Sequence, residues 1–102
     1  MAIVTAPDGQ SALDIVTEAM KQPETMFQVV VMDVRMPGMD GLETLRHMKK
    51  IAPKLPVLLL TGHASLGVAV QGMDLGAYDY MLKPVAINEL IIKMEEAVRA
   101  AA

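Results

Sequence analysis

The chain has 102 residues, 53% of them hydrophobic and 21% charged, so we expect one domain over residues 1–102 with a real hydrophobic core. It contains no cysteine, which excludes disulfides and thiol catalysis and makes the cytoplasm the default location. The net charge of −3 argues against nucleic acid as a main partner, and the apolar runs are too short for a membrane span or a signal peptide.

The first half of the chain alternates short apolar runs with an amphipathic stretch, which is typical of parallel strands joined by helices. A strand is predicted over Ala2–Thr5, then a turn at Pro7–Gly9 and a helix from about Gln10 to Lys21. The next strand, Phe27–Met32, is apolar apart from one residue, and Asp33 follows at its carboxyl end. The helix residues expected to face inward are Ala12, Leu13, Ile15, Val16, Ala19 and Met20.

The middle of the chain repeats this pattern once. Met36–Met39 is predicted to be a loop, and Asp40 is a suitable N-cap for a helix to about Lys50 that turns Leu42, Leu45 and Met48 inward. A third strand, Leu55–Leu60, ends at Thr61. The second and third strands are thus each followed by a polar residue.

The last third predicts a weak helix, a strand and a final helix. The Ala64–Leu75 helix contains Gly67 and Gly72, each of which costs about 1 kcal/mol relative to alanine, and Gly76 closes it. A fourth strand, Ala77–Leu82, ends at Lys83, and the last helix covers about Asn88–Ala100. Its expected inward residues are Leu90, Ile91, Met94, Ala97 and Val98.

Three polar residues therefore stand at the carboxyl ends of three successive strands: Asp33, Thr61 and Lys83. A single polar residue in such a position is most simply explained as the polar end of a strand. Ligands bind at this edge of an open α/β sheet, however, and the three residues together favour a binding or reaction site. Asp33 can act as a nucleophile toward a phosphoryl group. Lys83 and a magnesium ion can balance the charge on the transferring oxygens, and Thr61 can donate a hydrogen bond to one of them.

The segments around these residues make the prediction specific. Val30–Gly41 reads VVMDVRMPGMDG, Leu59–His63 reads LLTGH, and Gly76–Pro84 reads GAYDYMLKP. They resemble the receiver domains of two-component response regulators, and the resemblance extends from Ala2 to about Val98. It implies a three-layer α/β fold of the flavodoxin-like type, here with about four parallel strands and four helices.

The resemblance also implies a role for individual residues. Asp33 would accept a phosphoryl group from a histidine kinase or a phosphotransfer protein, and Thr61 and Lys83 would sense and neutralise it. Tyr80 falls at the aromatic switch position, where the ring turns inward when Thr61 moves. The Lys83–Pro84 peptide bond is often cis in this family.

One family feature has no counterpart in this sequence. Receiver domains open with a further strand that ends in a pair of acidic residues, followed by a first helix, and this sequence starts at what the family counts as its second strand. Asp8 follows a different strand, and Glu95–Glu96 fall on the last helix. A magnesium ion would be held by Asp33, by the backbone carbonyl of Arg35 and otherwise by water, which is a weak site.

Two other functions are open to such a chain. A phosphorylation-deficient interaction or oligomerisation module would keep the fold without the chemistry, and the missing acidic pair favours it. A phosphatase with Asp33 as nucleophile usually needs a second aspartate two residues on, where this chain has Arg35, so we expect no enzyme. A zinc site at His47 and His63 is not expected, because no third ligand accompanies them.

The missing strand has a consequence for assembly. In the family it lies between the strands corresponding to Ala2–Thr5 and Phe27–Met32, and closing that gap would place the four strands in sequence order, with three helices on one face and only Asn88–Ala100 on the other. We expect a homo-oligomer that covers the open sheet face and the last helix. The alternative is a monomer, if the missing segment belongs to a longer protein.

Overall fold

The structure is a computed structural model that describes residues 3–4, 9–21, 28–35 and 41–101. Strands and helices alternate along it, as the sequence predicts. In chain order, the elements are β1 (Ile3–Val4), α1 (Gly9–Met20), β2 (Val29–Asp33), α2 (Gly41–Ile51), β3 (Val57–Thr61), the 3-10 helix η2 (His63–Ser65), α3 (Leu66–Asp74), β4 (Asp79–Leu82) and α4 (Ile87–Ala101). The predicted turn residues Pro7 and Asp8, the Met36–Met39 loop and the Asp40 N-cap lie outside the described residues.

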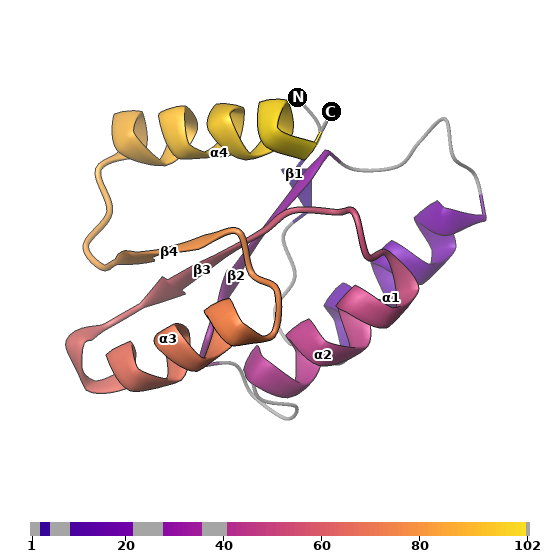
Figure 1. Ribbon diagram of the computed structural model, residues 1–102, viewed down its shortest axis with the longest axis horizontal. Coiled ribbons are helices and arrows are strands. Elements are labelled where there is room, and N and C mark those ends of the chain that lie inside the picture. The colour runs from indigo at the N-terminus through magenta and orange to yellow at the C-terminus, as the bar shows by residue number, and fades with distance from the viewer. Residues whose placement is uncertain (1–2, 5–8, 22–27, 36–40, 102) are drawn as a thin grey trace.

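The four strands form one parallel sheet in the order β1-β2-β3-β4. Ile3 pairs with Val29, so β1 lies directly beside β2. Helices α1, α2 and α3 cover one face of this sheet, and α4 lies on the other (Figure 1). The three-layer α/β fold and the predicted sequence order of the strands are therefore confirmed.

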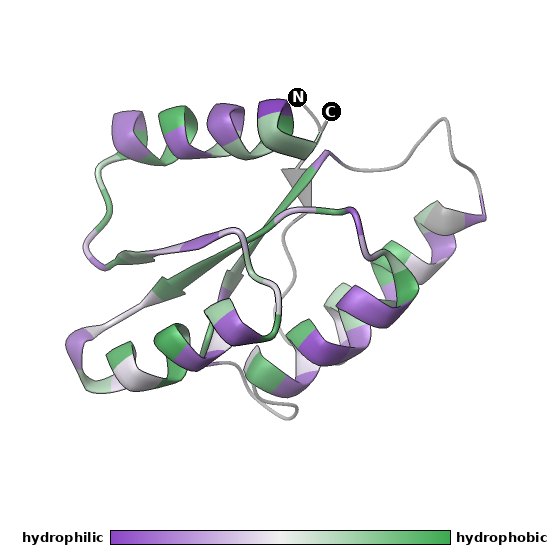
Figure 2. Cartoon of the chain, in the orientation of Figure 1, coloured by the Kyte–Doolittle hydropathy of each residue, from purple (hydrophilic) through white to green (hydrophobic). Residues whose placement is uncertain are grey.

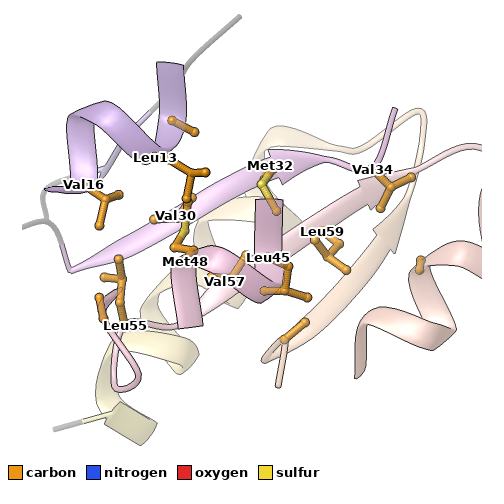
Figure 3. Close-up of a cluster of buried hydrophobic side chains, with 14 residues drawn as sticks. Leu13, Val16, Val30, Met32, Val34, Leu45, Met48, Leu55, Val57 and Leu59 are labelled. Carbon is orange, nitrogen blue, oxygen red and sulfur yellow. The ribbon is translucent and has the colours of Figure 1, made fainter. Parts of the chain in front are cut away.

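The larger hydrophobic core lies between the sheet and helices α1–α3. It is built from alternate strand residues because successive side chains of a strand point to opposite faces. Val30 and Met32 of β2 and Leu59 of β3 meet Leu45 and Met48 of α2 there (Figure 3). The other buried members are Ala12, Leu13, Val16, Val34, Ala52, Leu55, Val57, Ala69 and Ala77.

A smaller core lies between the sheet and α4. Val29 of β2 and Leu58 of β3 are fully buried there against Met94 and Ala97 of α4. Ile91, which was expected to face inward, is 41% exposed. The prediction for this residue is wrong, because only one side of α4 packs on the sheet and Ile91 lies beyond its margin.

The surface of the molecule follows from these two cores. Figure 2 shows β2 and β3 green over most of their length, while the helices alternate between purple and green as amphipathic helices do. No helix within the described ranges combines the length and hydrophobicity that crossing a membrane requires.

β3 and β4, like β2, start later than predicted. β3 begins at Val57, because Pro56 has no N–H and the N–H of Leu55 donates to the carbonyl of Ala52 instead of to the sheet. β4 begins at Asp79, because the N–H of Ala77 donates to the carbonyl of Gly72 at the end of α3. In both cases the preceding turn takes a backbone donor that the sheet would need.

The predicted Ala64–Leu75 helix is interrupted. It is divided into η2 and α3, and Ser65, with φ −112° and ψ 10°, stands at the boundary outside the α-helical region. The predicted end is confirmed: Gly76 has φ +103°, a conformation that glycine adopts without steric penalty.

Candidate phosphoacceptor site

The three predicted site residues meet at one edge of the sheet. Asp33 is the last residue of β2 and Thr61 the last residue of β3, while Lys83 directly follows β4. The register places Asp33 opposite Leu60 and Thr61 opposite Leu82. Parallel strands present their carboxyl ends at the same edge, which brings together residues as much as 50 positions apart.

Asp33 is held from both sides. Its Oδ2 forms an ion pair with the Nζ of Lys83, and its Oδ1 accepts a hydrogen bond from the backbone N–H of Arg35 at 2.9 Å. The side chain keeps 33% of its surface exposed. The carboxylate is thus oriented by protein donors while remaining accessible to a reactant from solvent.

Thr61 is fully buried, and its hydroxyl points along the chain rather than toward the carboxylate. It donates to the carbonyl of Gly62 at 3.0 Å. The backbone carbonyl of Thr61 accepts the N–H of Lys83 at 2.7 Å, which fixes the point where the lysine leaves β4. A Cβ atom on Gly62 would meet no heavy atom within 4 Å, so this side of the site is open.

Tyr80, the predicted switch residue, is half-buried in β4. It packs against the larger core on the side of the sheet that α3 covers. Beyond it, the Lys83–Pro84 peptide bond is cis, as the family resemblance suggested. The structure therefore places this ring on the face where α3 lies.

One contact at this edge was not predicted. The Nε of Arg35 donates to the Oγ of Ser65 at 2.5 Å, which connects the segment after β2 to the start of α3. Ser65 is 3% exposed. Only the position of Ser65 four residues after Thr61 hinted that it lies near this edge, because no spacing rule pairs a residue after one strand with a residue after the next.

The residues around Asp33 provide few side chains that could bind a metal ion. Within the described ranges no group of three or more histidine, cysteine, aspartate or glutamate side chains could hold a metal ion. His47 and His63 are both exposed. The two predicted magnesium ligands lie close in the chain, since Asp33 ends β2 and Arg35 follows two residues later.

Two lysines away from this edge have shifted pKa values. Hydrogen bonding and attraction to Asp79, 2.9 Å away, raise the pKa of Lys93 above its usual 10.5, and Glu96 adds to this. Burial lowers the pKa of Lys49, whose Nζ donates to the carbonyl of Leu55. Lys93 thereby ties α4 to β4, and Lys49 ties α2 to the turn before β3.

Known sequences resemble this chain over nearly its whole length. The family profile of the response regulator receiver domain matches residues 1–95. The transcriptional regulatory protein FixJ of Bradyrhizobium diazoefficiens is 42% identical over 94 residues, which cover 92% of this chain and 43% of FixJ. The DNA-binding transcriptional regulator NtrC of Escherichia coli is 38% identical over 98 residues, with 96% and 20% covered. The chain thus spans less than half the length of these curated relatives.

Solved structures agree with the sequence relatives. A response regulator receiver domain protein from Clostridium thermocellum superposes with a TM-score of 0.84 at 36% identity, covering 95% of this chain and 74% of that one. The receiver domain of NtrX from Brucella abortus gives 0.80 at 34% identity, covering 94% and 77%. The fold, the sequence and the profile agree, and this chain belongs to the response regulator receiver domain family.

Proposed function

We propose that Asp33 accepts the phosphoryl group in this receiver domain. The observation that carries the proposal is the ion pair between Asp33 and Lys83 at the carboxyl edge of the sheet. In the reaction, a carboxylate oxygen of Asp33 forms a bond to phosphorus while the bond from phosphorus to the imidazole nitrogen of a phosphohistidine breaks. The electron pair of the broken bond stays on that nitrogen.

The neighbouring residues have separate parts in this reaction. Lys83 stays beside the acceptor and balances the negative charge that the phosphoryl oxygens bring. Thr61 releases the carbonyl of Gly62 and turns its hydroxyl to a phosphoryl oxygen, since a charged acceptor forms a stronger hydrogen bond than a backbone carbonyl. The space that Thr61 vacates lies on the face of Tyr80, which would follow it inward as the switch residue.

The reaction is expected to need magnesium. Receiver domains in general use this ion, and in this chain the carboxylate of Asp33 and the backbone carbonyl of Arg35 would hold it, with water as the remaining ligands. The ion would offset charge on the transferring group. With so few protein ligands, its affinity before phosphorylation would be low.

The donor and the wider context follow from family membership. The phosphoryl donor would be a sensor histidine kinase or a phosphotransfer protein, in the cytoplasm, and the chain would act as a signalling module rather than as an enzyme. FixJ and NtrC are named as transcriptional regulators. We propose that this chain, like the matching parts of those proteins, controls the activity of an attached or associated effector.

An oligomerisation role is the second candidate, and it is compatible with the first. It is favoured by large apolar side chains on α4, where Ile87 is 65%, Ile91 41% and Ile92 56% exposed. Ile87 and Ile91 are one turn apart and lie on the same side of the helix. A second copy of the chain would cover them together with the adjoining sheet face.

The phosphoacceptor assignment can be tested with a small donor. Incubation with acetyl phosphate and magnesium should add one phosphoryl group, measured by intact mass, and Asp33→Asn should abolish the addition. Asp74→Asn is the matched control, because Asp74 is an exposed aspartate at the end of α3. Labelling that survives Asp33→Asn would disprove the assignment, and an unlabelled wild type would favour the phosphorylation-deficient module.

A further inference from the structure

Ser65 occupies the N-cap position of α3 but does not cap it. Serine is favoured at this position because its hydroxyl accepts a hydrogen bond from a backbone N–H in the first turn. Here the Ser65 side chain makes no such bond. Its Oγ accepts the Nε of Arg35 instead, although Ser65 is 3% exposed and its helix is adjacent.

Arg35 reaches Ser65 from the segment that carries the phosphoacceptor. It is two residues after Asp33, and its own backbone N–H donates to Asp33 Oδ1. Arg35 is exposed overall, although its Nε reaches the buried hydroxyl of Ser65. The Nε of Arg35 thus donates to a neutral hydroxyl, although the carboxylate of Asp33 is only two residues away in the chain.

The same helix start is also connected to Thr61. The carbonyl of Gly62 accepts both the Thr61 hydroxyl and the backbone N–H of Ser65. Two separate paths thus lead from the phosphoacceptor edge to the first turn of α3. One passes through Arg35 and the other through Gly62, and both end at Ser65.

We infer that Arg35 is a positioning residue that couples phosphorylation of Asp33 to the start of α3, an inference that rests on the proposed function of Asp33. In the unmodified chain Arg35 holds the Ser65 hydroxyl away from the helix. When Asp33 carries a phosphoryl group, the guanidinium moves to a phosphoryl oxygen. Ser65 is then released to cap α3, and the boundary between η2 and α3 is rebuilt.

Arg35 is expected to leave Ser65 for the phosphoryl group because the phosphoryl oxygens are the stronger hydrogen-bond acceptors. A phosphoryl group adds negative charge and three strong acceptor oxygens, and arginine binds such oxygens more tightly than it binds a neutral hydroxyl. Leaving the buried Ser65 hydroxyl without a hydrogen-bond partner would destabilise the fold. A helix start has backbone N–H groups without an intrahelical partner, and the N-cap position of Ser65 is where a side chain can accept from one of them.

The hydroxyl of Ser65 makes the inference measurable. If phosphorylation breaks the contact between Arg35 and Ser65 and frees the hydroxyl to cap α3, then a chain without that hydroxyl cannot show the change at the helix start. Beryllium fluoride with magnesium chloride is a suitable probe, because it binds an aspartate reversibly as a mimic of the phosphoryl group. Ser65→Ala loses the contact with Arg35 in the free chain and the cap of α3 in the bound chain, so its affinity for the probe should stay close to that of the wild type.

Companion variants separate positioning from a merely structural role. Ser65→Thr keeps the hydroxyl and should bind as the wild type does. Arg35→Ala should bind more weakly than Ser65→Ala, because it also lacks the guanidinium that contacts the mimic, and Arg46→Ala, on the exposed side of α2, should match the wild type. Amide hydrogen exchange over residues 63–70 should change on probe binding in the wild type and less in Ser65→Ala.

The outcomes distinguish this inference from the proposed function. If the wild type takes up no probe, or if Asp33→Asn takes it up equally well, both proposals are overturned. If uptake depends on Asp33 but the amide exchange of residues 63–70 responds to the probe equally in Ser65→Ala and in the wild type, the coupling through Arg35 is wrong and the phosphoacceptor assignment stands. An exchange response that Ser65→Ala loses and Ser65→Thr retains supports the coupling.

Discussion

Gly72 of α3 lies directly against Leu59 of β3, so closely that a Cβ atom added to Gly72 would overlap the Cδ1 of Leu59. Leu59 is fully buried in the larger core. Gly72 is itself a buried residue of α3. A glycine that weakens the helix therefore brings α3 close to the sheet.

Replacing the two glycines of α3 should have opposite effects. Gly72→Ala is expected to destabilise the fold by about 1–2 kcal/mol, because overpacking a tight core outweighs the gain in helix propensity. Gly67→Ala should stabilise it by about 0.5–1 kcal/mol, because no heavy atom lies within 4 Å of the new Cβ atom. Urea unfolding of both variants checks this, and equal effects would contradict the packing argument.

Helix α3 should exchange its backbone amides faster than α2. It has nine residues with two internal glycines and buries Ala69 and Gly72, whereas α2 has eleven residues and buries Leu45 and Met48 among others. Fewer buried side chains and more backbone freedom lower the free energy of local opening. Native-state hydrogen exchange measures this directly, and slower exchange in α3 would count against α3 as the moving element.

The ion pair between Lys93 and Asp79 should contribute to stability only below strongly alkaline pH. The pKa of Lys93 is raised above 10.5 in the folded chain. The contribution is therefore complete below the unfolded-state pKa and disappears as pH rises through the higher folded-state value. Because both side chains are about one-third exposed, Lys93→Met should cost no more than about 1 kcal/mol at neutral pH.

Unfolding measured at neutral pH and above the folded-state pKa tests this. The difference between wild type and Lys93→Met should shrink at the higher pH. Lys54→Met, at an exposed turn position, is the control and should change little at either pH. A stability difference that grows with pH would contradict a stabilising ion pair that is lost when Lys93 deprotonates.

The exposed isoleucines of α4 predict self-association. The chain should sediment at micromolar concentration with a mass above the 11.0 kDa of one copy. Ile91→Glu should return it to a monomer, since a charge would be buried in the interface. Val68→Glu places the same charge at an exposed apolar position of α3 and should leave the mass unchanged. A wild type that sediments as a folded monomer would refute the oligomer.

Much of the fold was predictable because the signals are local. Each strand is a short apolar run, each helix is amphipathic, and parallel strands leave few arrangements for the connections between them. The late starts of β3 and β4 were not predictable, because they depend on which acceptor the N–H groups of Leu55 and Ala77 find in three dimensions. Ile91 was misplaced for a similar reason: periodicity indicates a face, and the position of the neighbouring strands sets its width.

The candidate site also has features that the sequence predicts and one that it does not. Asp33, Thr61 and Lys83 could be placed together from sequence, because the ends of adjacent parallel strands must meet. The contact between Arg35 and Ser65 could not, since it depends on the direction of a long side chain and on a break between η2 and α3. Sequence predicts which residues share an edge, and side-chain packing decides which of them touch.

The sequence order of the strands has a consequence for how the chain folds. From β2 onward each strand pairs with its immediate predecessor, over separations such as Ile3 to Val29 and Leu58 to Asp79. Closing loops of this length costs less entropy than inserting a more distant segment between the strands. The contact between Asp33 and Lys83 joins residues that are further apart in the chain than the paired strand residues. Asp33 and Lys83 are 50 residues apart and can meet only after both β3 and β4 have docked. We therefore expect the edge that holds Asp33 and Lys83 to be among the last parts of the fold to form.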